Sequence, residues 1–291
     1  MRGRWLVTGA GGMLGRDVTA RLGAEAVGLG RAELDLRDPA AVRAALAAHR
    51  PEVVVNCAAW TAVDDAEGRE EEALDVNGTA VRELAAACAE TGAVLLHVST
   101  DYVFAGDAAV PYREAAPPRP RTAYGRTKLA GERAVLELLP ERGYVVRTAW
   151  LYGAGGGNFV RTMIRLEAER DLLDVVDDQR GQPTWSGDLA RVLHELGDAA
   201  LAGRAAPGVY HGTSGGEASW CELARETFRL LGADPARVRA TTSGAYPRPA
   251  PRPAYSVLGH ERWHGTGVRP IRDWRAALAG ALPALVSAER G

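Results

Sequence analysis

The sequence predicts an α/β fold built around a doubly wound parallel sheet. In the first half of the chain, short apolar runs alternate with segments of helical periodicity, a pattern typical of parallel strands covered by helices on both faces. The first apolar run leads through a glycine-rich turn, Gly9 to Gly15, directly into a helical segment. This strand–turn–helix order indicates a Rossmann-type domain that binds a dinucleotide.

The elements of this domain follow one another regularly. Strands are predicted over residues 4–9, 24–30, 51–59, 93–100 and 143–152, and helices over 12–23, 38–50, 70–92 and 122–139. Asp38 and Pro39 favour the start of a helix, because Asp accepts hydrogen bonds from N-terminal amides and Pro suits the first turn. We therefore expect residues 1–150 to form an NADPH-binding domain, to which later segments can return.

Beyond residue 150 the pattern loosens, and residues 151–291 are expected to form mainly a smaller C-terminal α/β substrate-binding domain. A glycine-rich turn at 153–158 precedes a predicted helix over 158–170, a strand over 172–178 and helices over 187–202 and 220–231. The proline-rich segment 245–259 is incompatible with a regular helix. It is either a linker or, given its two arginines and two tyrosines, a rigid arm laid across a site.

The composition argues against several classes of protein. A balance of 35 basic and 37 acidic residues gives a net charge of −2, which provides no polybasic surface for nucleic acid. No apolar run approaches the roughly 20 residues that cross a bilayer, and the first residues do not resemble a signal peptide. The three cysteines are far apart, so neither disulfides nor a thiolate zinc site is suggested. We expect a cytoplasmic monomer or homodimer without nucleic-acid or membrane partners.

Tyr124 and Lys128 are one helical turn apart, which places a phenol and an ammonium on the same helix face. A nearby cation stabilises phenolate and moves the phenol pKa from about 10 toward working pH. The glycine turn and the Ser99–Thr100–Asp101 run after an apolar strand distinguish this pair from a chance spacing. The sequence therefore predicts a proton-transfer site in which Lys128 makes Tyr124 more acidic.

The expected cofactor site begins at the glycine turn. Gly9, Gly12 and Gly15 permit a tight turn and a close approach of the pyrophosphate, whose charge meets the helix N-terminus. The second strand ends at Arg31 with no acid in place for a ribose hydroxyl, and a guanidinium suits a 2′-phosphate. We therefore expect NADPH, with NADH as the alternative. Further cofactor contacts are expected from Met13, Leu14, Asp35, Leu36, Ala58, Ala59, Thr61, Tyr124 and Lys128.

Taken together, these motifs resemble the extended short-chain dehydrogenase/reductase family, and the resemblance covers nearly the whole chain. The segments that carry it are the glycine turn and residues 56–64, 99–104, 124–132, 147–152, 178–184 and 252–258. The first three occur in variants across many sugar-nucleotide epimerases and dehydratases. Trp150, the run 178–184 and the proline–arginine arm narrow the match to members that reduce a sugar-nucleotide ketone.

The resemblance implies hydride transfer from NADPH to the C4 ketone of a dTDP-sugar, dTDP-4-dehydro-β-L-rhamnose. It implies that Tyr124 donates the proton to the developing alkoxide, while Lys128 lowers the phenol pKa and holds the nicotinamide ribose. Thr100 would hydrogen-bond the same oxygen. The substrate residues that the resemblance implies are Val63, Thr100, Asp101 and Trp150 around the sugar, and Arg252 at the diphosphate.

Plainer interpretations stay open for several of these residues. Trp150 can be ordinary core, Asp101 can cap the turn that follows it, and Arg252 can be a surface arginine. His97 lies inside an apolar strand, and we interpret it, like the other histidines, as structural or solvated. Some family members are described as binding magnesium between subunits through glutamates. At the comparable places this chain has Asp17 and the turn 186–188, so no metal site is expected.

Two other functions compete with reduction. The first is a different sugar-nucleotide reductase or epimerase, or a dehydratase; the last is disfavoured because Asp101 is followed by Tyr102 and not by Glu. The second is a non-catalytic NADP-binding regulatory subunit that resembles the partner of methionine adenosyltransferase. The intact set of Thr100, Tyr124 and Lys128 favours an enzyme over this subunit.

Overall fold

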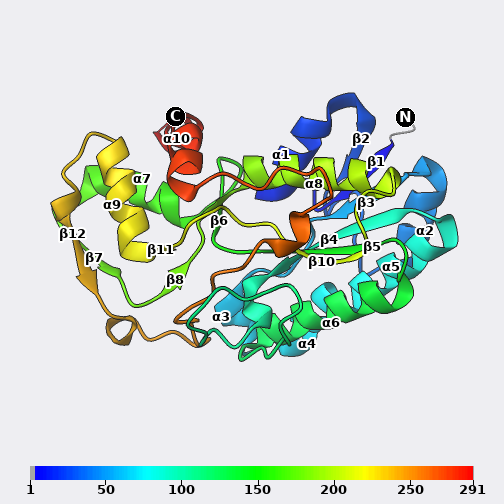
Figure 1. The fold of residues 1–291 in the computed structure, drawn as a ribbon, viewed down its shortest axis with the longest axis horizontal. Coiled ribbons are helices and arrows are strands. Elements are labelled where there is room, and N and C mark those ends of the chain that lie inside the picture. The colour runs from blue at the N-terminus through cyan, green and yellow to red at the C-terminus, as the bar shows by residue number, and fades with distance from the viewer. Residues whose placement is uncertain (1–3, 291) are drawn as a thin grey trace.

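The computed structural model describes residues 4–290, and at its centre is a six-stranded sheet (Figure 1). The strand order is β10-β5-β4-β3-β1-β2, and every pairing is parallel. The α/β fold class predicted from the sequence is confirmed. The six strands are β1 (Trp5–Thr8), β2 (Ala26–Leu29), β3 (Val53–Asn56), β4 (Val94–Thr100), β5 (Gly143–Thr148) and β10 (Gly208–His211).

Helices cover both faces of this sheet (Figure 1). One face carries α1 (Met13–Leu22) and α8 (Ser186–Leu201); the other carries α2 (Pro39–His49), α5 (Ala80–Thr91) and α6 (Ala123–Leu138). Along β1, Trp5 and Val7 join one core and Leu6 joins the other, because successive strand residues face opposite sides. Gly197 of α8 leaves room for the Trp5 ring, since a Cβ there would lie 2.2 Å from it.

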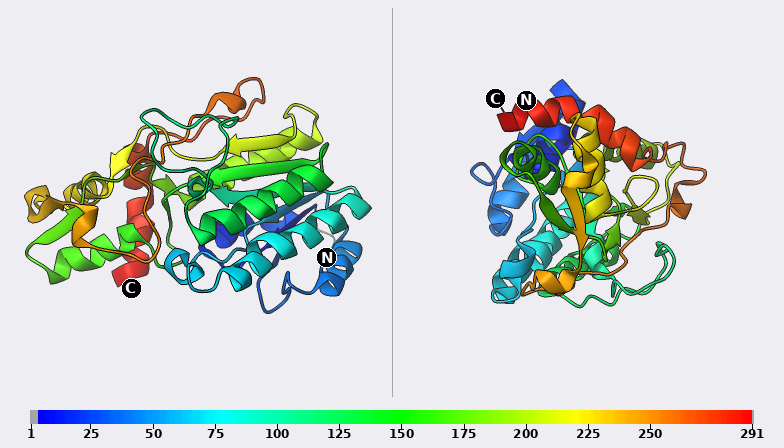
Figure 2. Two further views of the ribbon diagram at one scale, coloured as in Figure 1. Left: turned by 90° about the horizontal axis from the view of Figure 1, so that it is seen from below. Right: turned by 90° about the vertical axis from the view of Figure 1, so that its left-hand side faces the viewer.

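A smaller α/β part lies at one end of the sheet, beyond the carboxyl ends of its strands (Figures 1 and 2). It contains short strand pairs, with apolar cores beneath its helices. Its helices are α7 (Phe159–Glu169), α9 (Trp220–Leu230) and α10 (Trp274–Arg290). Its strand pairs are β7 (Leu173–Val176) with β12 (Val238–Thr241), β8 (Arg180–Gly181) with β11 (Ala218–Ser219), and β6 (Leu151–Tyr152) with β9 (Thr184–Trp185).

The predicted strand over 143–152 is wrong at its end. β5 stops at Thr148, and Trp150 adopts a left-handed backbone with φ 46°. The next two residues form β6, which pairs with β9 in a separate small sheet. The turn at Trp150 therefore directs the chain out of the main sheet and into the smaller part.

The predicted helix over 70–92 is interrupted. It consists of α4 (Glu70–Leu74), a π-helical turn (Asp75–Thr79) and α5, while a short helix α3 (Val63–Ala66) precedes it. Inside the π turn, the Asn77 side chain exchanges hydrogen bonds with the Trp60 backbone and donates to the Thr127 hydroxyl at 3.1 Å. The π turn thus places an inward-facing amide where it ties three segments together.

Segments after residue 150 return to the main sheet. β10 pairs with β5, and α8 packs on the same face as α1. No strand is predicted at β10, because it lies beyond the regular strand–helix alternation of the first half. The division at residue 150 stays a prediction, and residues 1–3 and 291 of the two predicted domains lie outside the described residues. Within residues 4–290, no helix has the length and apolar character needed to cross a membrane.

Candidate active site

The predicted catalytic residues meet where β4 ends and α6 begins. Thr100 is the last residue of β4, and α6 is capped by the Thr122 hydroxyl, which accepts the Gly125 N–H at 3.0 Å. A Cβ on Gly125 would lie 2.2 Å from the Tyr102 carbonyl oxygen, so glycine allows this close approach. As a result, Tyr124 is buried, hydrogen-bonds to Thr100 and meets the Tyr102 ring edge-on at 5.7 Å.

Lys128 is not among the groups that shift the pKa of Tyr124 in this coenzyme-free structure, so its acidification of the phenol stays a prediction. Burial raises the pKa of the Tyr124 phenol to about 12; the Thr100 hydrogen bond lowers it and the Asp101 charge raises it. The Lys128 Nζ instead donates to the Val98 carbonyl oxygen at 2.7 Å and lies 3.2 Å from His97 Nε2. The Lys128 side chain points toward β4, so burial dominates the environment of the phenol.

Asp101 does not merely cap the turn that follows β4. The Thr100 hydroxyl performs that capping, by accepting the Tyr102 N–H at 3.2 Å. Burial raises the pKa of the Asp101 carboxyl to about 6, against hydrogen bonds with Ser256 and Thr100. Its Oδ2 atom is buried and has no hydrogen-bond partner among the residues that the structure describes. Asp101 thus places beside Tyr124 a buried carboxylate with one oxygen that lacks a hydrogen bond, which is unfavourable for the stability of the charged form.

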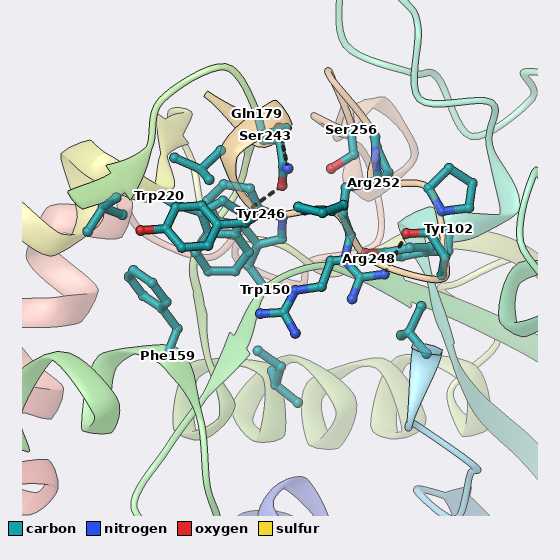
Figure 3. Close-up of a pocket in the computed structure, with 18 of the residues that line it drawn as sticks. Tyr102, Trp150, Phe159, Gln179, Trp220, Ser243, Tyr246, Arg248, Arg252 and Ser256 are labelled. Carbon is teal, nitrogen blue, oxygen red and sulfur yellow. Dashed lines mark hydrogen bonds between the residues drawn. The ribbon is translucent and has the colours of Figure 1, made fainter. Parts of the chain in front are cut away.

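A pocket of about 940 Å³ lies between Tyr102, the neighbour of Tyr124, and residues of the smaller part of the fold, whereas Thr100, Asp101 and Tyr124 are not among its lining residues (Figure 3). Tyr102 and Ser256 line it on the side of the catalytic cluster. Four residues predicted as cofactor or substrate contacts also line it, namely Thr61, Val63, Trp150 and Arg252.

Trp150 forms a wall of this pocket. Its indole stacks on Trp220 with ring centroids 3.5 Å apart and planes 5° from parallel, and Phe159 packs against Trp220 at 4.7 Å. A Cβ on Gly181 would lie 2.4 Å from the Trp150 ring, so that glycine makes room for it. Sequence reasoning missed Trp220 and Phe159, because an aromatic residue at the start of a helix carries no signal of the pocket it faces.

The proline-rich segment is an arm across the pocket. Asp64 holds it by accepting the Ala250 N–H at 3.2 Å and by an ion pair with Arg252 at 2.7 Å. The predicted diphosphate ligand Arg252 is therefore engaged by a carboxylate, which the sequence did not indicate. Arg248 is exposed, lines the same pocket and extends between the aromatic side chains and Tyr102 (Figure 3).

The glycine turn has the shape of a backbone cradle for a pyrophosphate. Gly9 has φ +66°, and a Cβ on it would lie 2.6 Å from the Ala58 amide nitrogen. A Cβ on Gly15 would lie 2.2 Å from the Gly9 carbonyl oxygen. α1 begins after Gly12 without a side-chain cap, so the amides of Met13 and Leu14 start the helix with no competing acceptor at that cap. A dinucleotide fits these features.

The other predicted cofactor residues vary in their surroundings. Arg31 is exposed and follows the end of β2, where the Leu29 carbonyl oxygen accepts the Ala10 N–H at 3.1 Å. Glu33 accepts the Gly30 N–H at 2.9 Å, a carboxylate that sequence reasoning did not place here. Ala58 and Ala59 lie half-buried beside the turn.

Asp35 and Leu36 are less accessible to a cofactor than expected. Asp35 forms an ion pair with Arg37 at 2.6 Å, and hydrogen bonds from Arg37 lower the pKa of its carboxyl to about 2. The Leu36 side chain is buried in the apolar core, which leaves its backbone to face a cofactor. Asp17, considered for a metal, accepts a hydrogen bond from Ser186. Residues 4–290 contain no group of three or more His, Cys, Asp or Glu side chains suited to a metal ion.

A protein-family model described as the RmlD substrate binding domain matches residues 3–287. The chain belongs to this family. It is 63% identical over 287 residues to a dTDP-4-dehydrorhamnose reductase of Streptomyces griseus, with 98% of this chain and 94% of the relative covered. It is 54% identical to a dTDP-4-keto-6-deoxy-D-glucose reductase of Streptomyces niveus, with 98% of each chain covered.

Solved structures agree with this assignment. The crystal structure of a dTDP-4-dehydrorhamnose reductase from Bacillus anthracis in complex with NADP is similar with a TM-score of 0.91. The two sequences are 35% identical, and the match covers 97% of this chain and 99% of the other. The family therefore extends over both the sheet and the smaller part of the molecule.

Proposed function

We propose that the protein reduces the C4 ketone of dTDP-4-dehydro-β-L-rhamnose with NADPH and releases dTDP-β-L-rhamnose, the last step of dTDP-rhamnose biosynthesis. The observation that carries this proposal is the buried Thr100–Tyr124 hydrogen bond, which lies next to Tyr102, a residue that lines a large pocket. A hydroxyl pair in that position can donate a proton to a carbonyl oxygen bound in the pocket. The similarity to named reductases supports the choice of substrate.

In the proposed reaction, NADPH supplies the hydride when it is bound. The glycine turn and the first turn of α1 hold its pyrophosphate, and Arg31 binds its 2′-phosphate. Tyr124 Oη carries a proton at neutral pH, because burial raises the phenol pKa to about 12, and it gives that proton to the C4 oxygen. The Thr100 hydroxyl donates to Asp101 Oδ1 at 3.0 Å and accepts the Tyr102 N–H at 3.2 Å, and these two bonds fix the oxygen that hydrogen-bonds to Tyr124.

The pocket suits a sugar nucleotide. The stacked Trp150 and Trp220 rings supply a flat apolar wall for a sugar or a base. Arg248 supplies an exposed guanidinium on the arm, which suits the diphosphate. We propose a cytoplasmic site of action, where the free thiols Cys57, Cys88 and Cys221 stay reduced. Whether the protein is a monomer or a homodimer stays a prediction.

A second candidate is the same reduction on a different dTDP-linked 4-keto-6-deoxy sugar. It is favoured by the 54% identity to a protein named dTDP-4-keto-6-deoxy-D-glucose reductase. The two candidates share every catalytic residue and differ in the configuration of the sugar ring that the pocket accepts.

The test is NADPH consumption with a panel of dTDP-4-keto-6-deoxy sugars, with the product identified by NMR. We expect stoichiometric oxidation of NADPH with dTDP-4-dehydro-β-L-rhamnose and higher kcat/KM than with the D-gluco ketone. The reverse preference would select the second candidate. Conversion of the sugar without net NADPH consumption would indicate an epimerase, and no conversion of any sugar would favour the regulatory subunit.

A further inference from the structure

A chain of buried polar side chains runs across the sheet and ends at Lys128. The Thr8 hydroxyl of β1 donates to Asn56 Oδ1 of β3 at 2.7 Å, and Asn56 Nδ2 lies 3.0 Å from His97 Nδ1 of β4. On its other side, His97 Nε2 lies 3.2 Å from Lys128 Nζ. His97 is fully buried, so these two contacts decide which ring nitrogen carries the proton.

The direction of the hydrogen bonds follows from the Asn56 amide. Its Oδ1 atom also accepts the Ala58 backbone N–H at 3.1 Å, and a backbone N–H can only donate. The NH₂ group of Asn56 therefore faces His97 and donates, which makes Nδ1 the acceptor. A neutral imidazole with Nδ1 as acceptor carries its proton on Nε2. That proton points at Lys128 Nζ.

An ammonium group has three donors and no lone pair, whereas a neutral amine can accept. The His97 Nε2–H is therefore matched only by an uncharged Lys128, whose own N–H donates to the Val98 carbonyl oxygen at 2.7 Å. We propose that His97 is a positioning residue that holds Lys128 as a neutral amine in the coenzyme-free protein. If Lys128 were charged, the hydrogen bonds from Lys128 through His97 to Asn56 would all have to reverse their direction. The Asn56 NH₂ would then face the Ala58 N–H, and two donors would point at each other.

None of the other titratable groups described next to Lys128 accounts for a neutral amine. On its own helix, Glu132 favours the charged amine, but it is committed to a buried ion pair with Arg147 at 2.7 Å and accepts from the Ser99 hydroxyl at 2.6 Å. After β3 stands the Cys57 thiol, whose pKa burial raises to about 12, so it is uncharged. Tyr124, one turn earlier on α6, is protonated at neutral pH. Burial itself lowers the pKa of Lys128 to about 8.

The sequence provides an independent reason to look at the protonation of this side chain. Lys128 is the one lysine among the 35 Lys and Arg residues of the sequence. Arginine stays protonated at any accessible pH, whereas lysine changes its charge readily when it is buried. Position 128 is thus the one basic position of the sequence, apart from its histidines and the chain terminus, at which a proton can be lost near neutrality.

The inference concerns a residue of the proposed reaction, but it is tested without turnover. Growth with ¹⁵N-lysine labels a single side chain in the full-length protein, and the Nζ shift distinguishes amine from ammonium during a pH titration. We expect a midpoint below about 7 in the coenzyme-free protein, so that the amine is mostly neutral at neutral pH. In His97→Gln the ring N–H is replaced by an amide whose carbonyl can accept from an ammonium, and we expect a midpoint higher by at least about one pH unit, a tenfold gain in proton affinity.

A matched control is His264→Gln, which replaces an exposed histidine and should leave the midpoint unchanged. The ring nitrogens of His97, labelled in the wild-type protein, give a second test that needs no substitution, and we expect the proton on Nε2. Equal midpoints in wild type and His97→Gln, or a proton on Nδ1, would overturn the proposal. Either result leaves the proposed reaction untouched, because no substrate is present.

Discussion

Tyr124 and Asp101 are neighbours in the site, and burial raises the pKa of both. Only Asp101 is charged at neutral pH. The phenol pKa rises to about 12, so Tyr124 keeps its proton throughout the neutral range. The Asp101 carboxyl pKa rises to about 6, so Asp101 is ionised at neutral pH although its surroundings disfavour the charge. The site therefore holds one proton that Tyr124 can donate and one carboxylate, Asp101, whose charge is destabilised by burial.

The first prediction concerns that proton. Tyr124→Phe removes the Oη–H and leaves the ring, so we expect kcat to fall by about 10²-fold or more, the scale of a lost general acid, with NADPH affinity near that of the wild type. Steady-state kinetics and a fluorescence titration of NADPH measure the two quantities. Unchanged turnover would remove Tyr124 from the proposed reaction.

The second prediction concerns the buried Asp101 carboxylate. Because the folded pKa of Asp101 is about 6, above its ordinary 3.8, the folded state binds more protons than the unfolded state between these values. Its contribution to stability is therefore lost as pH rises through about 6. Asp101→Asn should raise the free energy of unfolding by about 1–3 kcal/mol at about pH 8 and change it little at about pH 4.

Urea unfolding of wild type and variant at both pH values measures this difference. The Asp101→Asn gain must shrink on acidification, because the wild-type carboxyl is then neutral as well. A gain of equal size at both pH values would mean that the charge of Asp101 is not its cause.

At this scale, sequence reasoning located the residues but not all of their interactions. The spacing of Tyr124 and Lys128 correctly predicted a shared helix face, since helical geometry fixes it. The direction of the Lys128 amine depends on His97 and Val98, which belong to a strand about 30 residues away. A spacing rule within one helix cannot predict contacts with residues of another element.

At the scale of elements, the arm over the pocket has two arginines in different roles. Arg252 ties the arm to Asp64, whereas Arg248 is exposed toward the pocket. The sequence indicated an arm or a linker but gave no means of choosing between the arginines, because the choice depends on an acidic partner nearly 190 residues earlier. The same limit explains the missed break at Trp150, where an apolar run continues through a turn.

The third prediction separates these two arginines. Arg248→Ala should raise the KM for the sugar nucleotide about tenfold or more, as expected for a lost charge-assisted hydrogen bond to a diphosphate, with little change in kcat. Arg252→Ala should instead loosen the arm and speed hydrogen exchange of the Ala250 amide, which Asp64 accepts. If Arg252→Ala alone raised the KM and Arg248→Ala did not, Arg252 would regain its predicted role at the diphosphate.

At the scale of the whole molecule, the two halves of the sequence share one sheet. The apolar core on the α1 face combines Trp5 and Val7 of β1 with Leu189, Leu193 and Leu196 of α8, all buried. The repeating pattern of the first half predicted most of this sheet, since five of its six strands come from there. The sixth lies too far along the chain, beyond that pattern, for the pattern to reveal it.

The fourth prediction follows from this shared core. A fragment of residues 1–152 lacks α8 and β10, so we expect it to show no cooperative thermal transition by circular dichroism. Co-expression with residues 153–291 should restore a folded complex that melts cooperatively. A sharp transition in the fragment alone would show that the predicted domain of residues 1–150 is an independent folding unit.

The position of β10 also has a consequence for synthesis. β10 is the outermost strand and pairs only with β5, so the edge of β5 stays open on the ribosome until residues 208–211 have left the exit tunnel. During that interval the nascent chain presents an unpaired, apolar strand edge, the kind of surface that invites association with other chains. Slower translation through the segment between β5 and β10 would lengthen that exposure, and chaperone demand should rise with it.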